Sequence, residues 1–207
     1  ANAAAFGESI AGAAKGAKNA VCVTLGTGVG GGIIIDGKIY SGSNYAGGEL
    51  GHMVIVAGGK HCTCGRDGCW EAYASATALI YQTQIKMLDD KSSTMWNIVD
   101  GDLRNVNGKT AFDAYRMGDK AGCEVVDRYI FYIACGIANV INIFQPDIIC
   151  IGGGVSKEGD TLLAPLMSYV NKERFGKNLA KQTEIVVAKL GNDAGIIGAA
   201  NLYLNAE

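Results

Sequence analysis

The sequence predicts an α/β fold built on one mixed sheet that helices flank. In the first part of the chain, two apolar runs joined by a glycine-rich turn are followed by an Asp-Gly pair, which is typical of antiparallel strands in a meander. Further along, short apolar runs alternate with segments of helical spacing, which is typical of strands and helices in one lobe. At 207 residues the chain is long enough for one domain, or one large lobe, with its own core.

Composition narrows the class of protein. Hydrophobic residues make up 49% and charged residues 18%, which is a globular balance. The net charge is −2 and no basic run is present, so no nucleic-acid partner is expected. No apolar stretch reaches the ~18 residues of a membrane span and no leader opens the chain, so we expect no membrane partner and a reduced, cytoplasmic location.

The expected strands lie in two groups. Residues 21–25 and 33–35 are joined by the glycine-dense segment from Gly26 to Gly32, and the pair Asp36-Gly37 predicts a tight turn into residues 38–40. The later strands are residues 147–151 and 184–189. The cluster from Gly152 to Gly154 follows the first of these, at the strand end where open α/β sheets bind ligands.

Helical spacing predicts six helices. The first covers residues 1–18 and ends near Gly16, with Asn2 and Glu8 near its start, where acceptors and negative charge suit unpaired N–H groups. The last is capped by Asn192 or Asp193. Pro146 stops the long apolar helix, for which a core position is favoured over a subunit interface. The later helices cover residues 71–86, 109–117, 118–144, 161–173 and 193–204, and residues 88–109 are looser.

The segment from Glu49 to Glu71 contains a candidate metal site, which we call the zinc knuckle (residues 52–69). Thiolate sulfur and imidazole nitrogen are zinc ligands, and four protein ligands indicate a structural ion. Gly65 and Gly68 lie where a chain wrapped round an ion needs unusual backbone angles. The candidate ligands are His52, Cys62, Cys64 and Cys69.

Three alternatives to this site stay open. His61, next to Cys62, is the other candidate for the fourth ligand, although His52 would tie the knuckle to the preceding segment. A redox Cys-x-Cys pair is disfavoured because such pairs more often have two residues between the cysteines. Disulfides are disfavoured because the seven cysteines are odd in number and four lie scattered in apolar runs.

The glycine-dense segment from Gly26 to Gly32 is a candidate phosphate site. Backbone N–H groups without side chains form a concavity that binds anions, and the Thr27 hydroxyl adds a donor. The lysine of a Walker loop is missing, and a strand follows where a Walker loop or a dinucleotide fingerprint has a helix. Taken alone, such a run is more often a tight turn.

Together, these motifs resemble the signature of the ROK family (repressors, open reading frames and kinases). Within that family the chain is most similar to bacterial ATP-dependent glucokinases, over essentially its whole length. The Glu-x-Gly-His and Cys-x-Cys-Gly-x-x-Gly-Cys-x-Glu pattern is highly specific, whereas either glycine cluster alone is not. The matching segments are Leu25-Gly-Thr-Gly-Val-Gly-Gly-Gly-Ile33, Gly47-Gly-Glu49-Leu-Gly-His52, Cys62 to Glu71, Gly152 to Ser156 and Gly191 to Ala200.

The resemblance implies a kinase site that transfers phosphate from Mg-ATP to the 6-hydroxyl of glucose. Carboxylates suit sugar hydroxyls, and a zinc-bound histidine has its second ring N–H oriented by the metal. Zinc would then shape the site without taking part in the reaction. The resemblance assigns hexose binding to Glu49, His52 and Glu71, phosphate binding to Gly26, Thr27, Gly28 and Gly30, and contact near the adenosine to Gly153 and Gly154.

The resemblance also implies that residues 1–207 are the large C-terminal lobe of an actin-like ATPase, of the ribonuclease H type. The small lobe and the general-base aspartate are expected upstream, the aspartate directly before Ala1, so no catalytic residue is assigned here and the chain alone is expected to be nearly inactive. The alternatives are the sugar-sensing domain of a ROK repressor, or a kinase for N-acetylglucosamine, mannose or fructose. Polyphosphate is the other candidate donor, and a homodimer or larger homo-oligomer is expected.

Overall fold

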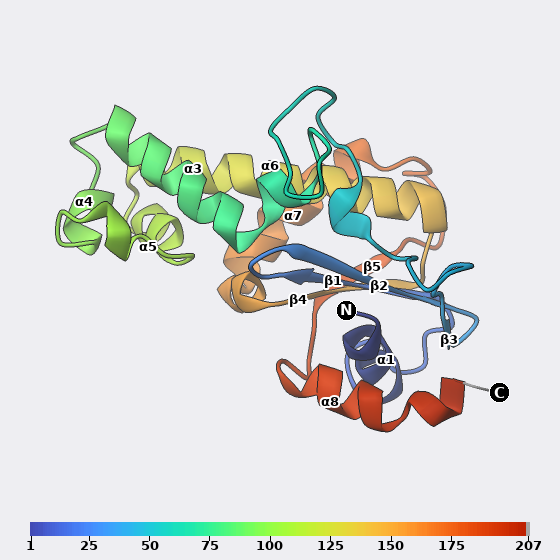
Figure 1. The fold of residues 1–207 in the computed structure, drawn as a ribbon. Coiled ribbons are helices and arrows are strands. Elements are labelled where there is room, and N and C mark those ends of the chain that lie inside the picture. The colour runs from blue at the N-terminus through green and yellow to red at the C-terminus, as the bar shows by residue number, and fades with distance from the viewer. Residues whose placement is uncertain (206–207) are drawn as a thin grey trace.

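One five-stranded mixed sheet forms the centre of the molecule, as the sequence predicts. The computed structural model describes residues 1–205, with helices on both faces of the sheet (Figure 1). The strand order is β3-β2-β1-β4-β5, in which β1 pairs antiparallel with β2 and parallel with β4. The strands are β1 (Ala20–Leu25), β2 (Val29–Ile35), β3 (Lys38–Ile39), β4 (Ile148–Gly152) and β5 (Glu184–Val187).

The glycine-dense segment is mostly strand, which corrects the prediction of a long turn. Only residues 26–28 form the turn, and β2 begins at Val29. A Cβ at Gly31 would lie 2.5 Å from the Gly48 carbonyl oxygen, and one at Gly32 would lie 2.5 Å from the Ala5 Cβ. The glycines of β2 therefore let neighbouring segments approach both faces of the strand. The predicted Asp36-Gly37 turn is confirmed, with φ angles of 51° and 79°.

Two helices, α1 (Asn2–Ala11) and α8 (Asp193–Ala200), pack together under one face of the sheet (Figure 1). They approach closely because a Cβ at Gly198 would lie 1.7 Å from the Ala3 carbonyl oxygen. The side chain of Asn192 makes no capping hydrogen bond to α8. The helix predicted for residues 193–204 is α8 followed by one short 3-10 turn, Leu202–Asn205.

Glu8 has a different role from the predicted one, because it lies near the end of α1. The helix ends at Ala11 and not near Gly16. The buried Glu8 carboxylate accepts hydrogen bonds from the backbone N–H groups of Ala13, Lys189 and Leu190, at 2.7, 3.1 and 2.7 Å. It therefore joins the end of α1 to the loop before α8. Asn2 is the first helical residue and its Oδ1 atom is buried without a partner among the described residues.

The other face of the sheet carries the larger group of helices (Figure 1). The helix expected over residues 71–86 is broken at Ser75, whose ψ of 160° is extended and whose hydroxyl caps the next helix by accepting from the Ala78 N–H. The helices are α2 (Glu71–Ala74), α3 (Ala76–Asp89), α6 (Lys120–Phe144) and α7 (Asp160–Glu173), with α4 (Met95–Ile98) and α5 (Thr110–Arg116) beyond the sheet at the far end of α3.

The long helix α6 is the main core helix, as predicted. Ile133 and Ile137 are fully buried, and Val125 is 5% exposed. Among the described helices, α6 alone is long and apolar enough to cross a membrane by length and composition, although its apolar residues do not form one unbroken run. Of its most apolar stretch, 56% is buried inside the domain. Its surface also receives Trp70, whose ring lies against Gly136 and whose indole N–H donates to the Tyr132 carbonyl oxygen at 2.8 Å.

Gly136→Ala should lower the free energy of unfolding by about 2 kcal/mol or more, because a Cβ there would lie 2.0 Å from the Trp70 ring and the helix backbone cannot move away. Gly195→Ala is the matched control on α8, since its Cβ would meet nothing within 4 Å. We expect this control to raise stability by about 0.5–1 kcal/mol. Urea unfolding measures both changes, and equal effects would contradict the packing argument.

Candidate functional site

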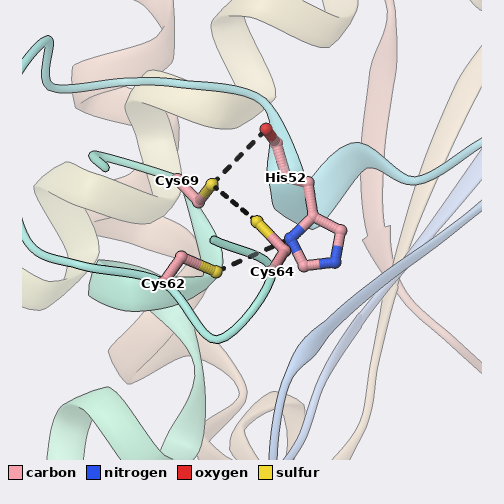
Figure 2. Close-up of side chains that lie close together, drawn as sticks. All are labelled: His52, Cys62, Cys64 and Cys69. Carbon is pink, nitrogen blue, oxygen red and sulfur yellow. Dashed lines mark hydrogen bonds between the residues drawn. The ribbon is translucent and has the colours of Figure 1, made fainter. Parts of the chain in front are cut away.

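His52, Cys62, Cys64 and Cys69 lie together at one side of the sheet, as the sequence predicts. Their ligand atoms all lie within 4.8 Å of one another. Figure 2 shows Nδ1 of His52 facing the sulfur of Cys62, at 3.7 Å, and the other ring nitrogen facing away from the three sulfurs. The Sγ atoms of Cys64 and Cys69 are 3.6 Å apart. This distance is far longer than the ~2 Å of a disulfide bond, and all seven cysteines are free.

The spacing of these atoms fits a tetrahedral zinc ion. With Zn–S bonds of about 2.3 Å and Zn–N bonds of about 2.0 Å, ligand atoms at tetrahedral angles lie roughly 3.5–3.8 Å apart. The observed separations of 3.6 and 3.7 Å agree with that geometry. His61 lies outside the cluster, because its ring is hydrogen-bonded to Asp67 at 2.9 Å and is exposed. The donor set therefore favours His52 as the fourth ligand.

The backbone of the zinc knuckle is shaped for this cluster. Gly65 and Gly68 have φ angles of 90° and 84°, in the left-handed region that glycine tolerates best. A hydrogen bond from the backbone N–H of Arg66 lowers the pKa of the Cys64 thiol. Burial raises the pKa of Cys69 to about 12, with contributions from the neighbouring thiols. Cys69 therefore holds its proton in the absence of a cation, and metal binding there would release it.

Glu71 connects the zinc knuckle to the turn between β1 and β2. Its Oε2 atom accepts a hydrogen bond from the Val29 N–H at 2.9 Å, and its Oε1 atom lies 4.0 Å from the Cys62 sulfur. A Cβ at Gly28 would lie 2.2 Å from Oε2, so this close approach requires glycine at position 28. One carboxylate thus contacts both predicted sites.

The turn of residues 26–28 is also held to the start of α3. The Ala76 N–H donates to the Gly26 carbonyl oxygen at 2.8 Å, and the Thr77 hydroxyl donates to the Thr27 carbonyl oxygen at 2.8 Å. Among residues 1–205 the backbone N–H groups of Thr27 and Gly28 donate no hydrogen bond. Two adjacent donors at a rigid turn are suited to an anion.

A hollow of about 390 Å³ brings two predicted sugar-binding residues, Glu49 and Glu71, together with the predicted phosphate-binding turn. Thr24 also lines this hollow, although no sequence motif indicated it. Side chains alternate along β1, and the side chain at position 24 points toward the glycine turn. His52 and Gly154 do not line this hollow. Gly154 begins the short 3-10 helix that follows β4. The lining residues are Thr24, Gly26, Thr27, Gly28, Val29, Gly30, Glu49, Glu71 and Gly153.

Gly153 places the second glycine turn beside the first. Its φ is 89°, and a Cβ there would lie 2.3 Å from the Leu25 carbonyl oxygen. Because β1 and β4 are parallel neighbours, the segments that follow them leave the sheet at the same edge. The hollow therefore lies where an α/β sheet binds ligands.

Nearly the whole chain matches a family model. The ROK family model covers residues 1–206. The chain belongs to the ROK family. It is 42% identical to a glucokinase of Halalkalibacterium halodurans over 209 aligned positions, covering all of this chain and 62% of that protein. It is also 30% identical to the xylose repressor of Bacillus subtilis, covering 99% of this chain and 49% of the repressor.

Solved structures agree with this ROK assignment. A ROK glucokinase from Streptomyces griseus, in complex with glucose and AMPPNP, superimposes with a TM-score of 0.90 at 35% identity, covering 98% of this chain and 65% of that one. The predicted actin-like fold is thereby confirmed. The chain spans 62–64% of the length of the curated glucokinases it matches.

Cys69→Ser should reduce bound zinc from about one ion per chain to nearly none, because three ligands hold zinc far more weakly than four. Cys123→Ser on α6 is the matched control, as Cys123 lies outside the cluster, and it should keep its metal. Elemental analysis of the purified proteins measures the stoichiometry. Zinc-free wild-type protein, after expression in zinc-supplemented medium, would refute this assignment.

Proposed function

We propose that this chain is the hexose- and nucleotide-binding lobe of a kinase that transfers phosphate from Mg-ATP to the 6-hydroxyl of a hexose, with glucose as the first candidate. The observation that supports the proposal is the hollow in which Glu49 and Glu71 meet the glycine turn. Acceptor-only carboxylates and free backbone N–H donors there match a polyhydroxyl sugar on one side and a phosphate on the other.

Each group has one task in this proposal. Glu49 and Glu71 accept hydrogen bonds from sugar hydroxyls, and the free N–H groups of Thr27 and Gly28 bind phosphate oxygens. Because Oε2 of Glu71 already accepts from Val29, Oε1 is the atom left for the sugar. Zinc, when bound to Nδ1 of His52, would leave the other ring nitrogen as an N–H donor of fixed orientation.

The general base lies outside these residues in our proposal. The family resemblance places an aspartate directly before Ala1, in a longer protein whose small lobe precedes this one. Ala1 lies beside β2 just after the glycine turn, since a Cβ at Gly30 would be 3.3 Å from the Ala1 Cβ. An aspartate at the preceding position would therefore have a short path to the hollow, which supports the proposal.

The second candidate is the sugar-sensing domain of a transcriptional repressor. Two xylose repressors are 30–31% identical to this chain over 99% of its length. The free Thr27 and Gly28 donors favour the kinase, because a repressor has no phosphate to bind at that turn. Nucleotide binding therefore distinguishes the two candidates.

Isothermal titration calorimetry tests the proposal directly. The zinc-loaded chain is titrated with glucose, N-acetylglucosamine, mannose, fructose and xylose, and then with magnesium AMPPNP. We expect glucose and the nucleotide to bind, and chelation of zinc to abolish the binding of glucose. Binding of xylose alone without nucleotide would favour the repressor, and binding of neither ligand would overturn the proposal.

Turnover should depend on the segment upstream. A protein extended by the small lobe and its aspartate should phosphorylate glucose at least about a hundredfold faster than this chain, because positioning and general-base catalysis each contribute that much or more. A coupled assay of sugar phosphate formation compares the two proteins. Equal rates would show that the base lies within residues 1–207.

Gly28→Ala should weaken glucose binding at least about tenfold, because the new methyl group would lie 2.2 Å from Oε2 of Glu71 and would displace the carboxylate. Gly26→Ala is a control in the same turn, since its Cβ would meet nothing within 4 Å. Calorimetry on both variants, with circular dichroism to verify folding, measures the difference. Similar losses in both would argue against a role for the Glu71 contact.

A further inference from the structure

A second hollow, of about 470 Å³, is lined by side chains of α3, α6 and the zinc knuckle. The two helices pack against each other on the same face of the sheet (Figure 1). None of the residues that line this hollow also lines the hollow of the proposed kinase site. Its volume is that of a small-molecule pocket, so we asked which ligand its side chains would recognise.

Two cations in this second hollow have no acidic partner. Lys60 and Arg128 are exposed and form no salt bridge among residues 1–205. Partial burial and the charge of Arg128 lower the pKa of the Lys60 ammonium, because like charges disfavour each other. Lys86 and Glu124 also line the hollow, but they pair with each other. An anion bound between Lys60 and Arg128 would therefore relieve their repulsion.

Lys60 is held in position before any ligand binds. Its Nζ atom lies 5.3 Å from the ring centroid of Tyr73 and 5.2 Å from that of Tyr81, so two aromatic rings attract the ammonium. The backbone is fixed as well, because the Lys60 N–H donates to the Tyr73 hydroxyl at 2.7 Å. Tyr73 in turn packs against Tyr132 of α6, with ring centroids 4.7 Å apart. A cation that is fixed in advance loses little conformational freedom when it binds a ligand.

Hydrogen-bond acceptors line the hollow further along α3. The Gln82 side chain donates through Nε2 to the carbonyl oxygens of Tyr73 and Ala78, at 2.9 and 3.0 Å, which leaves its Oε1 atom as an acceptor. The Asp89 carboxylate forms no salt bridge within residues 1–205. Asp89 lies about 12 Å along the helix from Tyr81, which contacts Lys60. The hollow thus has a cationic end and an end that accepts hydrogen bonds.

We propose that this second hollow binds a phosphorylated sugar, with its phosphate between Lys60 and Arg128 and its hydroxyls toward Gln82 and Asp89. Ammonium and guanidinium groups form charge-assisted hydrogen bonds with phosphate oxygens, and sugar hydroxyls donate to amide and carboxylate oxygens. A ligand with phosphate at both ends is disfavoured, because Asp89 would repel the second phosphate. The site does not depend on the proposed kinase activity, since it shares no lining residue with the kinase hollow.

Calorimetry with glucose 6-phosphate tests this site. The zinc-loaded chain is first saturated with glucose and magnesium AMPPNP, so that the kinase hollow is filled. We expect one glucose 6-phosphate to bind per chain, and Arg128→Gln and Lys60→Gln each to weaken this binding about tenfold or more, because each removes a charge-assisted hydrogen bond. Lys15→Gln, which removes an exposed lysine just after α1, is the matched control and should leave the affinity unchanged. Arg128→Gln should also keep the wild-type affinity for glucose, which separates this site from the kinase site.

Asp89→Asn separates recognition of the sugar from recognition of the phosphate. It should weaken the binding of glucose 6-phosphate severalfold and should not weaken that of inorganic phosphate, which is too small to reach both Lys60 and Asp89. Absence of glucose 6-phosphate binding overturns the proposal, and so does binding that neither Arg128→Gln nor Lys60→Gln weakens. Equal affinities for inorganic phosphate and glucose 6-phosphate would overturn it as well, because the ligand would then be recognised as an anion alone. Melting temperatures verify that every variant is folded.

Discussion

The hydrogen bond from the Val29 N–H to the Glu71 carboxylate is the constraint on which the candidate site depends. It joins residues 42 positions apart and links the start of α2, just after the zinc knuckle, to the start of β2, just after the glycine turn. The two preceding residues anchor the same short segment elsewhere. Cys69 belongs to the candidate metal cluster, and Trp70 is buried against α6 with its indole N–H donating to the Tyr132 carbonyl oxygen. Cys69, Trp70 and Glu71 thus contact the cysteine-histidine cluster, the core and the segment after the glycine turn, respectively.

Two of these three contacts are possible because the facing residue is glycine, which has no side chain. Gly28 allows the approach of Glu71, and Gly136 allows the approach of Trp70, with hypothetical Cβ distances of 2.2 and 2.0 Å. At Gly136 the facing atoms belong to a rigid ring, and at Gly28 they belong to the Glu71 carboxylate, so alanine at either position would move its neighbour. The glycines are therefore required by packing at least as much as by backbone freedom.

Sequence patterns predicted the local features well and the distant ones poorly. The Asp36-Gly37 turn and the grouping of His52 with the three knuckle cysteines were predictable because turn chemistry and ligand spacing are local. The break at Ser75 was not, because it depends on Thr77 of α3 meeting Thr27 of the turn, 50 positions before it. The three backbone N–H groups that donate to Glu8 include two from residues more than 180 positions away. The burial of Arg174 likewise depends on packing that no periodic pattern in the sequence indicates.

The mixed strand order explains why both glycine turns meet at one hollow. If β4 ran antiparallel to β1, the turn at Gly153 would leave the sheet at the opposite edge. Their parallel pairing brings Gly153 against Leu25, whereas the antiparallel β2 returns from the turn and carries Val29 to Glu71. The side of the hollow at Gly153 is thus set by strand topology, and the side at Glu71 by the zinc knuckle. A change in the zinc knuckle would therefore disturb one side of the hollow and leave the other in place.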